Sequence, residues 1–91
     1  MMDEGYRRLI VWRKSFNLSL GIYSATRNFP SDERFGLISQ MRRCSVSIVS
    51  NIAEGYARNT PGEFMHFLSI ARGSCAELET QLLLARELGY L

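Results

Sequence analysis

The sequence contains few of the residue types from which most catalytic and metal sites are built. It has one histidine, two cysteines and two prolines among 91 residues. A lone histidine without a nearby orienting aspartate does not support a nucleophile–base–acid triad, although serines are plentiful. The seven glycines are scattered and form no phosphate-binding loop. We therefore expect a protein that is not an enzyme, has no catalytic residues and needs no cofactor.

One segment has the spacing of a metal motif. The stretch EFMH, Glu63 to His66, matches the Glu-x-x-His pattern of di-iron helical bundles, and Glu54 lies on another predicted helix. Such a site needs two of these motifs and further carboxylates, whereas the chain has no second histidine. Because Glu63 is also explained by helix capping, we expect no metal site.

Long apolar runs are missing too. The longest, LIVW and LLLA, fall far short of the ~18 residues that a membrane span needs. The N-terminal MMDEGYRRL lacks the apolar core of a signal peptide. Cys44 and Cys75 lie 31 positions apart and form no CxxC motif. These features predict a cytoplasmic protein, with no membrane partner, whose two thiols are reduced and buried in the core.

Charge is distributed unevenly along the chain. Residues 1–58 carry nine cationic and five acidic side chains, a net charge of +4, whereas residues 59–91 carry two and four, a net charge of −2. Ten of the eleven cationic residues are arginine. Arginine pairs bidentately with carboxylates and phosphates, so this bias fits either internal ion pairs or an anionic partner.

Hydrophobic periodicity predicts an all-α fold of three helices in a single domain spanning residues 1–91. The first helix is expected from Arg8 to Arg27, before Pro30. The second is expected to open at Ser31 as N-cap and to run to about Tyr56, with Gly55 a natural place to fray. No stretch alternates with the period of a β-strand.

The third helix has the clearest start signal, TPGE at residues 60–63. Thr60 is the predicted N-cap, Pro61 the first helical residue and Glu63 the second half of a capping box. We expect the helix to end where Gly89 adopts a left-handed turn. Gly73, inside the helix, is interpreted as a site of close helix packing.

Apolar side chains indicate how these helices pack as an up-down antiparallel bundle. The third helix has a heptad seam with alternating spacings of four and three residues, as in left-handed bundles. Its members are Phe64, Leu68, Ala71, Cys75, Leu78, Leu82 and Ala85. The second helix offers a core arc of Leu37, Met41, Cys44, Ser45, Ile48 and Ile52. The first has a wider arc, predicting burial against more than one neighbour: Val11, Trp12, Phe16, Leu18, Ile22 and Tyr23.

A polar row adjoins the core arc of the second helix. Its members are Gln40, Arg43, Ser47, Asn51, Glu54 and Arg58, with Glu77 and Gln81 as potential partners on the third helix. The row is either a solvated face or a buried polar network that fixes which helices or subunits pair. Since a buried, unpaired charge is costly, we expect pairing wherever these side chains are buried.

Three segments of the chain resemble a known family. They are LIVWRKSFNLSLGIY, FPSDERFGLISQMRRCSVSIVSNIAEGYAR and EFMHFLSIARGSCAELETQLLLARELGYL, with SNIAEG and ELETQL the most specific parts. The chain is similar to the four-helix-bundle proteins encoded in intervening sequences of bacterial large-subunit ribosomal RNA genes. That family is similar in turn to the accessory variability determinant of diversity-generating retroelements.

The resemblance implies an up-down bundle that assembles into a ring-like homopentamer. It also implies motif positions without a catalytic role, namely Trp12, Gln40, Arg42, Arg43, Ser50, Asn51, Glu54, Gly55, Glu77, Glu79 and Gln81. Members of this family continue into a fourth helix, which this sequence lacks. We therefore expect an open apolar groove, filled by a neighbouring chain unless the gene product is truncated.

Two functions remain open. The candidate nucleic-acid-binding residues are Arg7, Arg8, Arg13 and Lys14, among which lie Tyr6 and Trp12, together with Arg42 and Arg43. Repeated around a ring, this basic surface would bind RNA or DNA with a steep dependence on salt. Alternatively, Arg43 and Arg58 pair internally with Glu54 and Glu77, and the remaining cations only solubilise the surface. The second function is a scaffold for a protein partner such as a reverse transcriptase.

Overall fold

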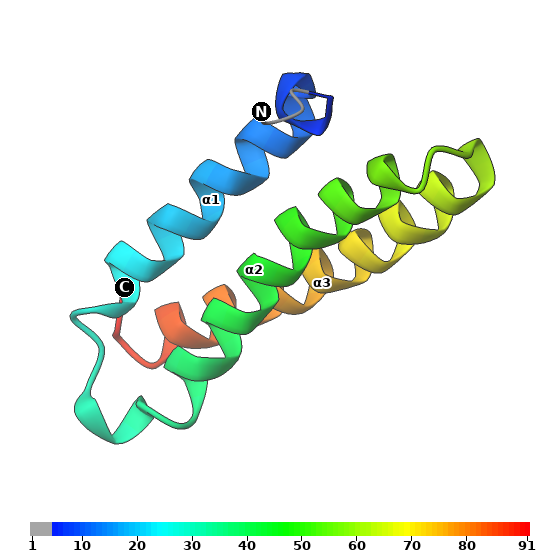
Figure 1. Ribbon diagram of the computed structural model, residues 1–91. Coiled ribbons are helices and arrows are strands. Elements are labelled where there is room, and N and C mark those ends of the chain that lie inside the picture. The colour runs from blue at the N-terminus through cyan, green and yellow to red at the C-terminus, as the bar shows by residue number, and fades with distance from the viewer. Residues whose placement is uncertain (1–4) are drawn as a thin grey trace.

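Three antiparallel α-helices make up most of the computed structural model, which describes residues 5–91 (Figure 1). The first four residues of the predicted domain lie outside this range. In chain order the elements are the 3₁₀ turn η1 (Tyr6–Arg8), α1 (Ile10–Thr26), the 3₁₀ turn η2 (Ser31–Glu33), α2 (Leu37–Ala57) and α3 (Pro61–Glu87). No strand occurs in the described range, so the predicted all-α class is confirmed. None of these helices is long and apolar enough to cross a membrane.

The first helix is slightly shorter than predicted. Arg8 belongs to the separate turn η1, and Leu9 follows it with extended backbone angles of φ −69° and ψ 129°. The helix ends at Thr26, whose hydroxyl donates a 2.7 Å hydrogen bond to the carbonyl of Ile22. The stop before Pro30 agrees with the expected effect of that proline on the residues before it.

The predicted start of the second helix is wrong. Ser31 opens the short turn η2, with no side-chain cap in the described structure, and α2 begins six residues later at Leu37. Gly36 interrupts the helical path with φ −108° and ψ −110°. The backbone N–H of Leu37 donates to Oε1 of Glu33 at 3.1 Å, so Glu33 satisfies an amide at the start of α2.

The third helix begins and ends as predicted. The backbone N–H of Glu63 donates to Oγ1 of Thr60 at 3.2 Å, and Pro61 is the first helical residue. The Glu63 carboxylate accepts from the Thr60 hydroxyl at 3.3 Å. At the other end, Gly89 has φ 82°, and the N–H of Tyr90 donates to the carbonyl of Ala85 at 2.9 Å. This bond closes the left-handed helix terminus expected from the glycine.

The roles predicted for two glycines are wrong. Gly55 does not end α2; it is buried inside the helix, where an added Cβ would lie 2.6 Å from Cβ of Phe67 and 3.2 Å from Cδ1 of Phe64. An added Cβ on Gly73 would meet nothing within 4 Å among the described residues. The close approach between α2 and α3 therefore depends on Gly55.

The core lies along α2, which is the central helix. Its buried apolar side chains are Met41, Cys44, Ile48 and Ile52 from α2, Ala71, Leu78 and Ala85 from α3, and Ile22 and Phe29 from α1 and the turn after it. These residues confirm most of the core arc predicted for α2 and of the seam of α3, in which Leu37, Phe64, Leu68 and Leu82 are partly buried. Cys75, predicted to be buried, is exposed.

Cys75 is exposed because α1 and α3 do not pack directly on each other. Within the described chain, no Cα atom of α1 lies within 8 Å of one in α3. A groove of about 360 Å³ separates them, continuous with a second cavity of about 500 Å³. We call the two together the α1–α3 groove; its apolar lining includes Val11, Leu18, Ile48, Leu68, Cys75 and Leu82. The wide apolar arc of α1 is thus only partly covered.

Candidate nucleic-acid interface

Four cationic side chains crowd the N-terminal end of the first helix. Arg7 and Arg8 lie on η1, and Arg13 and Lys14 lie on the first turns of α1. All four are exposed, and none forms an ion pair within residues 5–91. Residues 5–31 contain no aspartate or glutamate at all. We call these four residues the basic patch; its charge is not neutralised by carboxylates of the same segment.

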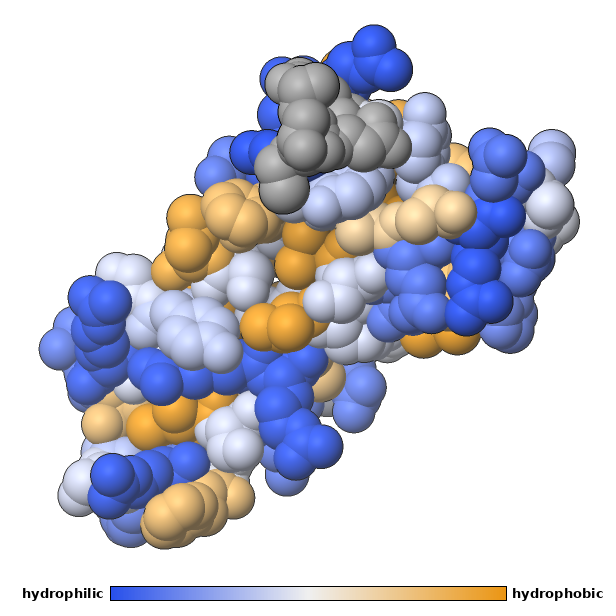
Figure 2. All heavy atoms as spheres, in the orientation of Figure 1, coloured by the Kyte–Doolittle hydropathy of each residue, from blue (hydrophilic) through white to orange (hydrophobic). Residues whose placement is uncertain are grey.

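Aromatic rings lie beside the basic patch. The ring centroids of Tyr6 and Trp12 are 5.4 Å apart, and those of Trp12 and Phe16 are 5.0 Å apart with an interplanar angle of 26°. Phe16 is 43% exposed, so the row reaches the solvent. Figure 2 shows that hydrophobic and hydrophilic side chains are mixed over this face of the molecule. Proteins that bind single-stranded nucleic acid combine cations, which contact the phosphates, with aromatic rings on which the bases stack.

Arg42 is apart from the basic patch and is held by α1. Its Nε donates to Oγ1 of Thr26 at 2.9 Å, and its Nη2 donates to the carbonyl of Tyr23 at 3.4 Å. The guanidinium also lies 4.7 Å from the centroid of the Tyr23 ring. These contacts fasten the C-terminal end of α1 to α2, so a structural role accounts for Arg42.

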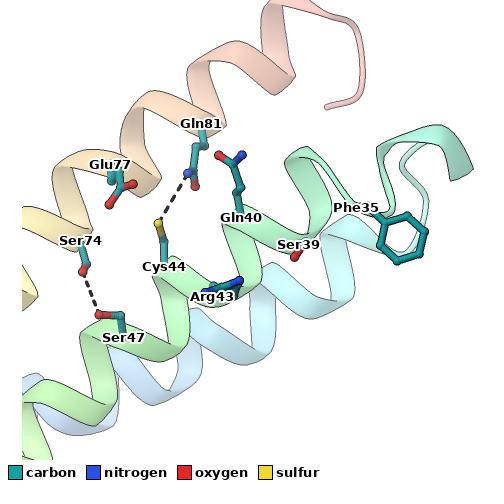
Figure 3. Close-up of a pocket in the computed structure, with 9 residues that line it drawn as sticks. All are labelled: Phe35, Ser39, Gln40, Arg43, Cys44, Ser47, Ser74, Glu77 and Gln81. Carbon is teal, nitrogen blue, oxygen red and sulfur yellow. Dashed lines mark hydrogen bonds between the residues drawn. The ribbon is translucent and has the colours of Figure 1, made fainter.

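Arg43 points away from α1, into a polar trough between α2 and α3. Figure 3 shows it at the edge of this cavity, which has a volume of about 510 Å³. We call the cavity the α2–α3 trough; it is lined by Phe35, Ser39, Gln40, Arg43, Cys44, Ser47, Ser74, Glu77 and Gln81. Arg42 and Arg43, adjacent in sequence and predicted to act together, therefore lie on different sides of α2.

The rest of the predicted polar row follows the α2–α3 contact. The hydroxyls of Ser47 and Ser74 are 2.9 Å apart, and Nδ2 of Asn51 donates to the carbonyl of Ser47 at 2.8 Å. Further along, Arg58 pairs with Glu54 at 2.9 Å and with Glu63 at 3.5 Å. Both pairs are about half exposed, so solvent screening leaves each with little effect on stability.

One predicted pairing is missing. Arg43 and Glu77 line the same trough, but their charged atoms are more than 4.0 Å apart and neither has another ion-pair partner among the described residues. The row is therefore neither a uniformly solvated face nor a continuous buried network. In the middle of the row, Ser47 is hydrogen-bonded to Ser74 of α3, whereas Arg43, near the start of the row, has no ion pair with Glu77.

The inner wall of the trough is formed by Cys44 and Gln81. Nε2 of Gln81 donates to Sγ of Cys44 at 3.5 Å. Burial raises the pKa of the Cys44 thiol; the Gln81 hydrogen bond opposes this shift, whereas the negative charge of Glu77 and a hydrogen bond to its carboxylate add to it. Oε1 of Gln81 is buried without a hydrogen-bond partner in the described structure, which costs about 1–3 kcal/mol.

A protein-family model matches nearly the whole of this chain. The model of the family described as 23S rRNA-intervening sequence protein matches residues 7–91. The chain belongs to the 23S rRNA-intervening sequence protein family. The match spans the basic patch, the α2–α3 trough and the α1–α3 groove. No curated protein matches the chain.

This 23S rRNA-intervening sequence protein shows no metal-binding cluster in its described part. Residues 5–91 contain no group of three or more histidine, cysteine, aspartate or glutamate side chains placed to hold a metal ion. In the Glu-x-x-His stretch, Glu63 belongs to the start of α3, and the ring of His66 lies 5.3 Å from that of Phe67 in an edge-on contact.

Two aromatic residues of this family member were missed as candidate contacts in the sequence. Phe16 was assigned to the apolar arc of α1, yet it extends the aromatic row of the basic patch. Phe35 is 89% exposed at one end of the trough. The sequence does indicate that Phe35 is exposed, because it lies in the polar segment DERFG and belongs to none of the apolar arcs of the helices.

Proposed function

We propose that this chain is a non-enzymatic accessory protein that binds RNA, or DNA, through the basic patch. The observation that carries the proposal is a group of four exposed cations, without ion pairs inside residues 5–91, beside a row of aromatic rings. The chain is proposed to act as a homo-oligomer, a pentamer by the family resemblance, so that each subunit adds a copy of the patch. No catalytic group or cofactor is part of this function.

Repetition matters because one patch makes few contacts. Each phosphate neutralised on a single strand contributes about −0.7 to the slope of log affinity against log salt. Four cations per chain therefore give a slope of about −3, which corresponds to weak binding at physiological salt. An oligomer that presents several patches to one strand raises the affinity through effective concentration, without any new kind of contact.

The test is to remove the patch and to compare it with a control variant that loses the same amount of positive charge elsewhere. One variant carries Arg7→Ala, Arg8→Ala, Arg13→Ala and Lys14→Ala. Its matched control carries four substitutions of exposed arginines elsewhere, Arg27→Ala, Arg34→Ala, Arg58→Ala and Arg86→Ala. Binding of a labelled single-stranded RNA is measured by fluorescence anisotropy over a series of salt concentrations.

We expect the patch variant to lose most of its affinity and its salt slope to become less negative by about 3. The control variant should keep the greater part of both, because it loses the same charge outside the patch. If the patch variant binds RNA as the wild type does, the basic patch is not the interface. Equal losses in both variants would mean that only net charge matters.

The α1–α3 groove supports a second candidate, a scaffold for a protein partner such as a reverse transcriptase. Val11 is 48% exposed and Leu18 39% exposed along the groove, and apolar surfaces of this kind mark protein contacts. A partner that is retained on the immobilised chain after nuclease treatment, and lost when Leu18→Glu is introduced, favours the scaffold. Loss of the partner on nuclease treatment favours nucleic-acid binding.

A further inference from the structure

The α2–α3 trough has three chemically different parts in a fixed order. Phe35 stands at one end, Gln40, Arg43 and Gln81 lie in the middle on facing helices, and Glu77 lies toward the other end (Figure 3). An aromatic ring, a cation with an amide opposite it, and a carboxylate thus follow one another along a single cavity. The basic patch lies elsewhere, on η1 and α1, so the trough is a separate site.

The charged groups of the trough are not ion-paired. Neither Arg43 nor Glu77 has an ion pair within the described range, and the hydrogen bond between the Glu77 carboxylate and the Cys44 thiol leaves the carboxylate with further acceptor positions. Gln81 is 6% exposed, and its Oε1 has no donor there. Cys44 between them is a neutral thiol at ordinary pH, because burial raises its pKa, so it adds no negative charge that would repel a phosphate.

We infer that the trough binds a guanine nucleotide within single-stranded RNA, with Glu77 and Gln81 accepting hydrogen bonds from the base and Arg43 contacting the adjacent phosphate. This inference rests on the proposed RNA-binding function and gives it base specificity. Bases of single-stranded RNA are recognised on their Watson–Crick edge by side chains of matching hydrogen-bonding character.

Guanine is the base that fits two acceptors. Its Watson–Crick edge carries adjacent donors, N1–H and the 2-amino group, which a carboxylate can bind bidentately. Adenine and cytosine offer one amino group each on this edge, beside an acceptor that a carboxylate repels, and uracil offers one N–H between two carbonyl oxygens. Oε1 of Gln81 is buried in the unbound chain and lacks a donor; a turn of this side chain toward the trough brings it to the remaining amino hydrogen of the guanine.

Phe35 fits the neighbouring nucleotide. Its ring is 89% exposed, and its one aromatic or cation contact in the described structure is the Arg34 guanidinium 5.6 Å from its centroid. A base adjacent to the guanine can stack on this ring, since stacking on exposed aromatic side chains is a main source of affinity for single strands. Arg43 between the two ends is then placed for the linking phosphate.

The experiment compares three labelled pentanucleotides, UUGUU, UUAUU and UUIUU, by fluorescence anisotropy with the wild-type chain. Inosine differs from guanosine only in lacking the 2-amino group. We expect UUGUU to bind on the order of tenfold more tightly than UUIUU and UUAUU, as for one bidentate base contact. The same titrations with guanosine and inosine 5′-monophosphate test whether the free nucleotide is also bound.

The matched variants are Glu77→Gln and Glu79→Gln. Both remove one negative charge from α3, but Glu79 lines the α1–α3 groove instead of the trough. Glu77→Gln should abolish the preference for guanine over inosine, whereas Glu79→Gln should keep it. Phe35→Leu should weaken the binding of all three oligonucleotides and leave the preference for guanine over inosine unchanged.

The outcomes separate this inference from the proposed function. RNA binding that depends on the basic patch but shows no preference for guanine overturns the trough site and leaves the proposed function intact. A preference that survives Glu77→Gln also overturns it. Guanosine monophosphate bound more tightly than inosine monophosphate, with no RNA bound, supports a free-nucleotide site and overturns the proposed function. Binding of neither overturns both.

Discussion

Gly55 is a residue at which α2 and α3 approach each other closely. An alanine Cβ at this position would lie 2.6 Å from Cβ of Phe67, closer than van der Waals contact permits, and the neighbouring atom belongs to the stiff base of a side chain. The two helices must therefore move apart if Gly55 is replaced. The contact distance of the α2–α3 pair is thus determined by the absence of one methyl group.

We predict that Gly55→Ala destabilises the chain by about 1–3 kcal/mol, the usual cost of overpacking a core. Gly73→Ala is the matched control on α3, where no described atom lies within 4 Å of the new Cβ. It should raise stability by up to about 1 kcal/mol through helix propensity alone. Urea denaturation followed by circular dichroism measures both; equal effects would show that helix propensity, and not packing, decides at Gly55.

The two glycines also show what the sequence could not reveal at this scale. Gly55 and Gly73 look alike in sequence, each a glycine within a helical pattern. Which of them is packed against a neighbour depends on the rotation of each helix about its axis, which is set by the whole contact. Arg42 and Arg43 differ for the same reason: adjacent helical residues point about 100° apart, so one reaches α1 and the other enters the trough.

At the scale of whole elements, the end of α3 is fastened to the start of α2 by one carboxylate. Oε1 of Glu33 accepts from the N–H of Leu37 at 3.1 Å, and Oε2 accepts from the hydroxyl of Tyr90 at 2.9 Å. The ring of Tyr90 also packs 5.2 Å from that of Phe29. The turn between α1 and α2 is thus joined to the C-terminal end of the described chain.

This bond predicts a loss of stability at alkaline pH. The hydrogen bond to Glu33 raises the pKa of the Tyr90 phenol above its ordinary value of 10.0, and burial and the negative charges of Glu33 and Asp32 act in the same direction. Between the unfolded and folded pKa values the unfolded chain binds fewer protons, so stability falls as pH rises. The contribution is fully present below pH 10 and is lost as pH rises through the raised folded value.

The measurement is the urea midpoint of unfolding at about pH 8 and about pH 11, on either side of the ordinary tyrosine pKa. The wild type should lose more stability over this interval than Tyr90→Phe, which keeps the ring but cannot ionise. Tyr56→Phe serves as the control, because Tyr56 has no hydrogen bond from its hydroxyl in the described residues. Identical losses in wild type and Tyr90→Phe would refute the role of this bond.

Element boundaries were predictable where the signal is local. Thr60, Pro61 and Gly89 act within a few residues of their own position, and the structure bears out all three. The start of α2 was not predictable in the same way. Ser31 is a good N-cap in isolation, but the cap is useful only if the following residues continue as a helix, and Gly36 interrupts them. The role of Glu33 depends partly on Tyr90, 57 residues away, and no local pattern encodes it.

At the scale of the molecule, the helices form an open arrangement with α2 in the centre. The described chain measures 42 × 26 × 20 Å, and α1 and α3 flank α2 without approaching each other (Figure 1). The three helices and the core arc of α2 followed from periodicity. The exposure of Cys75 could not be predicted in this way. Periodicity shows that Cys75 shares a face of α3 with the other seam residues, but not whether another helix covers that part of the face.

The α1–α3 groove leads to the last prediction, that the chain associates through it. Leu18 lines both cavities of the groove and is 39% exposed, so its burial by a second copy removes apolar surface from water.

We expect the wild type to form a discrete oligomer at micromolar concentration, measured by size-exclusion chromatography with light scattering after nuclease treatment. Leu18→Glu should shift it to monomer with unchanged helicity, because a carboxylate in the groove opposes burial. Leu83→Glu, at a 48% exposed position of α3 outside the groove, should leave the oligomer intact. A wild-type monomer, or equal effects of both substitutions, would mean that the groove does not hold copies of the chain together.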